Sequence, residues 1–290
     1  MRRLVRFALL LLALAALAGC SGARLAYNNA DTVLRWMADD YFALEGAQEQ
    51  DFKQRLARFH AWHRSEELPR YSVLMTSAGD KLADGLTAGE LLWAWESVKG
   101  RYRRMAAHAA PELAAVLVTL TPAQFERLDK KFAESDAEYA KKHLKGGETE
   151  QRERRDKRTL ELIREWFGDL TGAQEAQLRI ASTRLPLLYT LRLQNRQRRQ
   201  AEFVGLLKTY RTPAELEPRL THWLTEWEEG ASPEYRSLSE QHRALYVQML
   251  LDLDRGLTAA QRAHAAARCY EYAEIFRALA AQGKLPPSGA

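Results

Sequence analysis

Three polar side chains in one short stretch have the types and spacing of a metal or acid–base site. His60, His63 and Glu67 follow one another at intervals of three and four residues. On a helix this spacing puts them near one face, where they could bind a metal ion together with one further ligand. The stretch lacks the His-Glu-x-x-His pattern, and His63 lies on an apolar stripe that begins at Phe52. We therefore expect a packed helix junction, and a hydrolase or metal enzyme is the least favoured functional hypothesis.

The expected junction centres on Pro69, which should break or kink a helix that runs up to it. Trp62 and Tyr71 stand on either side of this bend. The expected ion pairs join one of two neighbouring acids to one of two neighbouring bases: Glu66 or Glu67 with Arg64 or Arg70.

A cysteine near the start of the chain carries a different chemistry. Three arginines precede an apolar run, Phe7 to Ala18, that is shorter than the roughly 20 residues needed to cross a membrane, so residues 1–19 are predicted to be a signal peptide. The run closes with Leu17-Ala18-Gly19-Cys20, which resembles the bacterial lipobox. In that motif the cysteine thiol receives a diacylglyceryl group and, after cleavage before it, an N-acyl chain such as palmitate. An ordinary cleaved signal with an incidental cysteine is the alternative.

Lipid attachment at Cys20 would fix the location of the protein. Ser21 follows the cysteine, and in the lipoproteins that this start resembles the absence of Asp there favours the outer membrane. We therefore expect a lipid-anchored protein that faces the periplasm. Residues 20–27 are expected to form a short tether of at most about 25 Å, which holds the body close to the lipid.

The remaining composition restricts the chemistry further. Removal of residues 1–19 takes away three arginines and no acid, so the formal net charge falls from +5 to +2. Cys269 is then the only unmodified thiol, which leaves no intramolecular disulfide. It shares a helical stripe with Ala265 and Ala273, so we expect a core residue, with a nucleophile or an intermolecular bridge as alternatives. The chain has no glycine-rich phosphate loop, no Gly-x-Ser-x-Gly and no cysteine pair for a metal, and we predict no cofactor.

A basic patch is the last candidate site: Arg192, Arg196, Arg198 and Arg199. Such a patch could face anionic lipid head groups, where each surface cation contributes about 1 kcal/mol. The alternative is a solvated helix face whose arginines pair with acids such as Glu202. We expect no nucleic-acid partner for an exported protein.

Amphipathic helices must position all these residues, because no convincing alternating strand occurs in the chain. We predict an all-α fold, an elongated bundle of about ten helices forming a single domain over residues 28–282. A break near 146–147 would divide this domain into two lobes. Gln174 to Tyr210 is expected to form one long helix bent at Pro186, and residues 283–290 a disordered tail.

The most regular local pattern is a repeated helix start with Thr at the N-cap and Glu or Gln three residues later, the capping box. It occurs as Leu86-Thr87 with Glu90, Leu120-Thr121 with Gln124, Leu170-Thr171 with Gln174, and Leu257-Thr258 with Gln261. The separations share no period, which argues against a solenoid. The pattern also resembles the Leu-Thr-x-x-Gln motifs of small periplasmic chaperones of the envelope-stress type, which implies a protein that holds unfolded clients, although capping alone explains it.

A wider resemblance covers nearly the whole chain. It rests on Arg24-Leu25-Ala26-Tyr27-Asn28-Asn29, on Trp36, Asp40-Tyr41 and Leu44, and most strongly on Ala61-Trp62-His63-Arg64-Ser65-Glu66-Glu67-Leu68-Pro69-Arg70-Tyr71. The sequence resembles the domain-of-unknown-function 6279 family of Gram-negative lipoproteins. This resemblance implies a cell-envelope lipoprotein and supplies no catalytic residues. We therefore favour a non-enzymatic binding or scaffold module, attached to the membrane by its lipid and contacting an envelope protein, over a chaperone-like binder of unfolded clients.

Overall fold

The computed structural model describes residues 19–282, and this part of the chain is all-α, without a strand. The predicted all-α, multi-helix fold class is confirmed. Residues 1–18 of the expected signal peptide and the expected tail 283–290 lie outside the described residues. No helix within residues 19–282 is both long and apolar enough to cross a membrane.

The helices are joined by short turns. In chain order they are α2 (Gly19–Asn28), α3 (Ala30–Phe42), α4 (Ala47–Trp62), the π-helical turn η1 (His63–Glu67), α5 (Leu68–Asp84), α6 (Ala88–Leu117), α7 (Pro122–His143), α8 (Glu148–Phe167), α9 (Gly172–Thr183), α10 (Tyr189–Thr209), α11 (Pro213–Thr225), α12 (Pro233–Arg255) and α13 (Ala259–Gln282).

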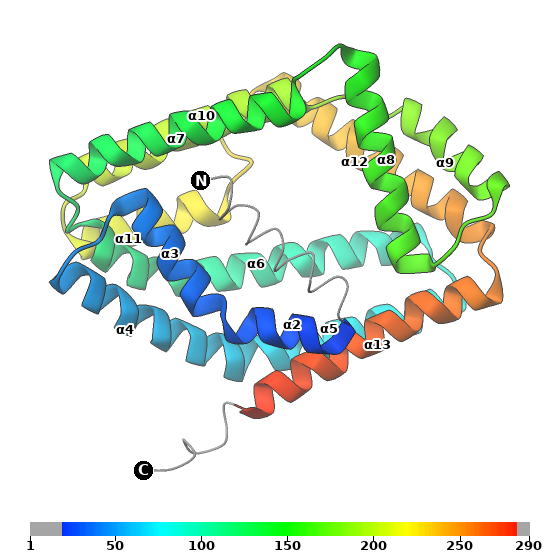
Figure 1. Cartoon of the computed structure of the whole chain (residues 1–290), viewed down its shortest axis with the longest axis horizontal. Helices are drawn as coiled ribbons and strands as arrows, with labels where there is room; N and C mark the ends of the chain where they lie inside the picture. Colours follow the sequence, from blue (N-terminus) through cyan, green and yellow to red (C-terminus); the bar gives the residue numbers. More distant parts are fainter. Residues whose placement is uncertain (1–18, 283–290) are drawn as a thin grey trace.

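The helices are arranged as an elongated frame (Figure 1). α7 and α10 run side by side along one long edge, and α4, α5 and α13 form the opposite edge, where α5 packs along α13. α8, α9 and α12 close one end of the frame, and α6 crosses it to pack against α11 near the other end. The turn at Gly146 and Gly147, where a break was expected, connects α7 to α8 at a corner of this frame.

Buried apolar side chains gather in three clusters in the described part of the chain, instead of one central core. The first joins α6, α7, α10 and α11 and includes Leu117, Leu128 and Leu207. The second joins α8, α9, α12 and α13 and includes Ile163 and Leu253. The third is small, with Leu68 from α5 and Ile275 and Leu279 from α13, and α2 packs onto it through Ala23 and Tyr27.

Two helices are unusually open. α3 has no buried residue, and the buried residues of α6 all lie in its second half, from Ala106 onward. The first half of α6 exposes a stripe of apolar side chains, defined here as the α6 stripe: Leu92, Trp95, Val98 and Tyr102. Such a stripe is unusual on a soluble surface and is typical of an interaction site.

Of the break or kink expected at Pro69 the break is absent, and the expected single helix bent at Pro186 is wrong. The helix does not break at Pro69, because α4 continues through η1 into α5, and Pro69 falls in the first turn of α5, directly after the wider π turn. The segment from Gln174 to Tyr210 is not one bent helix, since residues 184–188 separate α9 from α10. Arg155 of α8 stabilises this interruption by donating to the carbonyl oxygens of Ser182 and Leu185 at 2.6 and 2.9 Å.

Candidate functional site

The π turn brings His63 between two tyrosines. The Tyr27 hydroxyl lies 3.0 Å from His63 Nδ1, and the Tyr71 hydroxyl lies 3.3 Å from Nε2. Burial lowers the pKa of His63 and raises the pKa of Tyr27 to about 12. Both ring nitrogens of the imidazole are therefore occupied by protein hydroxyls, and neither is free to bind a metal in this arrangement. Through Tyr27 the ring joins α2 to the π turn.

Glu67 is fully buried and is neutralised by arginines. Arg104 Nε, from α6, lies 2.5 Å from its carboxylate, and Arg101 Nη1 lies 3.5 Å away. The expected partner Arg70 is also present, with Nε at a longer 3.9 Å. The sequence did not predict Arg104 as the main partner, because Arg104 lies on another helix, far from Glu67 along the chain. Glu67 thus ties α6 to the π turn.

The third member of the candidate triad, His60, does not join the other two in a ligand set. Its ring packs edge-on against Tyr27, with centroids 4.9 Å apart, and its buried Nε2 has no hydrogen-bond partner among the described residues. Burial, with a further contribution from Arg64, lowers its pKa. Within residues 19–282 no group of three or more His, Cys, Asp or Glu side chains is placed to hold a metal ion. The arrangement is a packed helix junction in which the stacked rings of Trp62 and His108 also take part, 3.7 Å apart.

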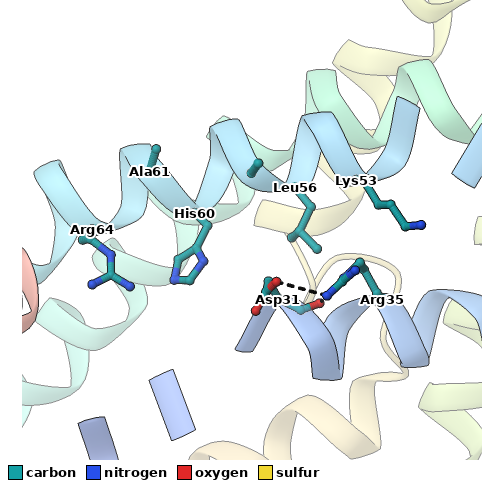
Figure 2. Close-up of a pocket in the computed structure, with 8 residues that line it drawn as sticks. Asp31, Arg35, Lys53, Leu56, His60, Ala61 and Arg64 are labelled. Atoms are coloured by element: carbon teal, nitrogen blue, oxygen red, sulfur yellow. Dashed lines mark hydrogen bonds and ion pairs between the residues drawn. The ribbon is translucent and has the colours of Figure 1, made fainter. Parts of the chain in front are cut away.

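A cavity of about 450 Å³ lies beside this junction, between α3 and α4. Figure 2 shows Leu56 and His60 of α4 and Arg64 of η1 pointing toward the side on which α3 lies. The cavity is lined by Asp31, Arg35, Lys53, Leu56, Ala57, His60, Ala61 and Arg64. The lining therefore combines an apolar patch from α4 with three permanent cations and one carboxylate.

The cations of this cavity differ in how they are neutralised. Arg35 pairs with Asp31 at 3.3 Å, and Lys53 pairs with Glu49 at 2.6 Å. Arg64 has no acidic partner in the described part of the chain. Its guanidinium donates only to neutral acceptors: Asn28 Oδ1 at 2.9 Å, Leu279 O at 3.2 Å and Gln282 Oε1 at 3.1 Å. It also lies over the Tyr27 ring, 5.0 Å from the centroid, so the side chain is held in place without a carboxylate partner among the described residues.

The predicted lipidation site, Cys20, lies at the start of α2. The segment 20–27, expected as a tether, belongs to this helix. Because an α-helix rises 1.5 Å per residue, its length is about 10 Å, well below the extended limit of about 25 Å. α2 is docked on the body through Ala23 and Tyr27. The predicted attachment point is thus joined to the fold by a packed helix.

The predicted basic patch does not form a free cationic surface. Arg196 pairs with Asp136 at 2.7 Å. Arg198 pairs with Glu202, which agrees with the alternative that these arginines form ion pairs on the helix face. Arg199 donates to Trp223 O at 2.8 Å and stacks over the Trp223 ring, and burial lowers its pKa. Three of the four arginines are therefore used within the protein.

All four predicted capping boxes are present. In each, the Thr hydroxyl accepts from the backbone N–H three residues later, and the Glu or Gln side chain accepts from the Thr backbone N–H. Two of the glutamines also bind each other. Gln174 Nε2 donates to Gln261 Oε1 at 2.9 Å, and Gln261 Nε2 donates to Gln174 Oε1 at 3.0 Å. The motif is thus satisfied inside the molecule and does not by itself support client binding.

The same reciprocal pair recurs at the other end of the frame, where sequence reasoning missed it. Gln124 Nε2 donates to Gln48 Oε1 at 2.8 Å, and Gln48 Nε2 donates back to Gln124 Oε1 at 3.2 Å. Gln48 belongs to Leu44-Glu45-Gly46-Ala47-Gln48. Like the motif that begins at Leu120, this segment has Leu at its first position and Ala-Gln at its fourth and fifth positions. It has Glu45 where that motif has Thr121. The Ala-Gln dipeptide was the signal that could have identified it.

The remaining candidate, Cys269, is buried in α13 with 2% of its surface exposed, so the expectation of a core residue is confirmed. Burial raises the pKa of this thiol to about 11. At neutral pH the thiolate needed for nucleophilic chemistry is therefore almost absent.

Comparison with known proteins gives one match. The model of a family described as a family of unknown function, DUF6279, matches residues 40–236. This range includes the π turn, Glu67 and the α4 wall of the cavity, and it covers more than half of the chain. No curated protein and no solved structure matches.

Proposed function

The chain belongs to the DUF6279 family, and we propose that it is an outer-membrane lipoprotein, held by acyl chains on Cys20, that acts as a non-enzymatic binding or scaffold module facing the periplasm. The signal-peptide pattern and the Leu17-Ala18-Gly19-Cys20 sequence support the anchor. Two or three acyl chains hold a protein firmly on a membrane, because each buried methylene contributes about 0.8 kcal/mol.

The observation that carries the proposal is the docking of α2. The helix begins at Gly19, next to the lipidation site, and Tyr27 at its other end reaches His63 in the π turn. A flexible tether would let the body rotate freely above the lipid. A packed helix instead transmits the position of the anchor to the frame, so the membrane would fix which faces of the body point toward envelope partners. Such a fixed orientation is useful to a scaffold.

The α6 stripe supplies a surface for such contacts. Its four side chains are between 37% and 59% exposed, and they recur every three or four residues along one side of α6. The polar groups at the junction already have partners inside the protein, since Glu67 pairs with arginines and His63 hydrogen-bonds to tyrosines. An exposed apolar stripe beside neutralised polar groups supports binding more than catalysis.

The anchor is tested by metabolic labelling of the full chain with a fatty acid. We expect label in the wild type and none in Cys20→Ser, which should also leave the membrane fraction. Cys269→Ser is the matched control, because it removes the other cysteine of the chain and should keep both label and location. Label that persists in Cys20→Ser would refute the anchor.

The binding role is tested separately by cross-linking in intact envelopes. A variant with Leu92→Ser and Trp95→Ser should lose cross-linked species that the wild type forms. Ile180→Ser is the control, since Ile180 is 61% exposed on α9 at another part of the frame. If the stripe variant and the control gave the same products as the wild type, the stripe would have no role in binding.

A further inference from the structure

We infer that the cavity between α3 and α4 binds the phosphate of an anionic phospholipid head group. This inference deepens the proposed function and rests on its placement of the protein at a membrane surface. The cavity, at about 450 Å³, falls within the size range of small-ligand sites, roughly 300–1,000 Å³.

The charge of the lining points to an anion. Three permanent cations, Arg35, Lys53 and Arg64, face a single carboxylate, that of Asp31. Arg35 pairs with Asp31, and Lys53 pairs with Glu49, which lies outside the lining. The guanidinium of Arg64 lies over the Tyr27 ring and hydrogen-bonds to neutral acceptors, so its single positive charge has no carboxylate partner among the described residues. Arginine and lysine together are the side chains that bind phosphate oxygens best, through charge-assisted hydrogen bonds.

The apolar part of the lining points to an amphiphile instead of a bare ion. Leu56, Ala57 and Ala61 of α4 supply the apolar part of the lining, here called the apolar patch, and they lie between Lys53 and Arg64 in the sequence. A head group whose phosphate meets the cations could lay its glycerol and the first carbons of its chains on this patch. A free phosphate would leave the patch exposed to water and gain nothing from it.

The position of the cavity points to the membrane as the source. Arg64 donates to Asn28, the last residue of α2, at 2.9 Å. Asn28 lies about 12 Å along the helix axis from Cys20, at 1.5 Å per residue. An acyl chain attached at Cys20 therefore enters the bilayer close to this end of the cavity, where head groups of neighbouring lipids are within reach.

The test uses the full chain, purified in an uncharged, phosphate-free detergent, and three soluble probes followed by titration calorimetry. The probes are dihexanoyl phosphatidylglycerol, dihexanoylglycerol with the same chains and no phosphate, and inorganic phosphate. We expect the phosphatidylglycerol to bind at least about tenfold more tightly than either of the others, because only it engages both the cations and the apolar patch.

Two variants locate the site. Arg35→Gln with Lys53→Gln should weaken binding of the phosphatidylglycerol about tenfold or more, since two charge-assisted hydrogen bonds are lost. Lys208→Gln is the control, because this lysine is similarly exposed and lies on α10. Circular dichroism of each variant shows whether the fold is kept, and Lys53→Gln alone serves if the double variant unfolds.

The outcomes are distinct. Equal binding of dihexanoylglycerol would overturn the role of the cations, and equal binding of inorganic phosphate would overturn the lipid as the source. An unchanged affinity in the cavity variants would overturn the location. The probes are soluble and the assay does not depend on lipidation, so a failed anchor at Cys20 and a failed ligand here would be seen in different experiments.

Discussion

The paired glutamines of the second cluster allow the internal role of the repeated helix starts to be measured. Gln174 is 5% exposed, and its side chain makes four hydrogen bonds. Its Oε1 accepts from Thr171 N and from Gln261 Nε2, and its Nε2 donates to Gly256 O at 2.8 Å and to Gln261 Oε1. Gln174→Glu retains an acceptor for the cap and removes both donations. The substitution therefore separates the pair from the cap.

The expected cost follows from these contacts. Gly256 O and Gln261 Oε1 would each face a carboxylate oxygen in place of an N–H. A buried acceptor left unpaired costs about 1–3 kcal/mol, and burial of the new charge adds to this. The retained donation from Gln261 becomes charge-assisted and offsets part of the loss. We expect Gln174→Glu to lower the free energy of unfolding by about 3–5 kcal/mol.

Glu90→Gln is the matched control. Glu90 occupies the same position in its capping box and accepts from the Thr87 backbone at 2.9 Å, but it is partly exposed and has no partner glutamine within hydrogen-bonding distance in the described structure. Glutamine can still accept that bond, so only the interaction of the charge with the helix N-terminus and with Lys81 is lost. We expect this change to be much smaller than that caused by Gln174→Glu, because the charge of Glu90 is screened by solvent.

Urea unfolding at neutral pH, followed by circular dichroism, measures both variants. A second readout is the pH dependence. The buried site raises the pKa of the introduced carboxyl, so the cost of Gln174→Glu should shrink as pH falls and the protonated group can again donate one hydrogen bond. Equal and small costs for the two variants would refute the reasoning, because they would mean that the cross-motif pair contributes nothing beyond the cap.

Three further predictions concern single residues. Gly79→Ala should destabilise the protein by about 1–3 kcal/mol, because a Cβ at this position would lie 2.6 Å from the Tyr270 ring. Gly100→Ala should stabilise it by about 0.5–1 kcal/mol, because no atom lies within 4 Å of a Cβ there. Thermal unfolding compares the two variants. Cys269, buried and with its pKa raised to about 11, should react with a thiol reagent at pH 8 only after urea is added, and rapid labelling of the native protein would contradict this. Burial lowers the pKa of His63, so as the pH falls the unfolded chain binds a proton at this residue before the folded chain does. The free energy of unfolding should therefore decrease as the pH drops below about 6.5. His63→Gln should make this decrease shallower by up to about 1.4 kcal/mol per pH unit, as measured by urea unfolding across a pH series.

Local rules predicted the local parts of this structure. The all-α class followed from helical periodicity, and the four capping boxes followed from Thr with Glu or Gln three residues later, because both ends of each interaction lie within one turn. The contacts that define the candidate site are of another kind. Arg104 reaches Glu67 from a different helix, and the second member of each glutamine pair lies more than 70 residues away. The periodicity of a helix shows which of its faces is buried, but it does not show which other helix packs there. These partners could therefore not be predicted from one sequence.

The continuity of the helix at Pro69 shows how the site depends on a departure from the regular α-helix. Leu56 in α4 and Leu68 in α5 are both buried, at 8% and 1% exposure. In an uninterrupted α-helix, positions twelve apart differ in direction by about 120°, at roughly 100° per residue, so both could not face the same neighbours. A π turn takes up one extra residue, and the difference falls to about 20°. The turn at His63–Glu67 therefore changes the direction in which residues after it point, relative to those of α4, in one long helical segment that passes a proline. This segment carries the cavity wall, the histidine that contacts Tyr27 of α2, and the acid that binds α6. α2, the cavity and α6 therefore all contact the segment at or next to this turn, and their relative positions depend on its register.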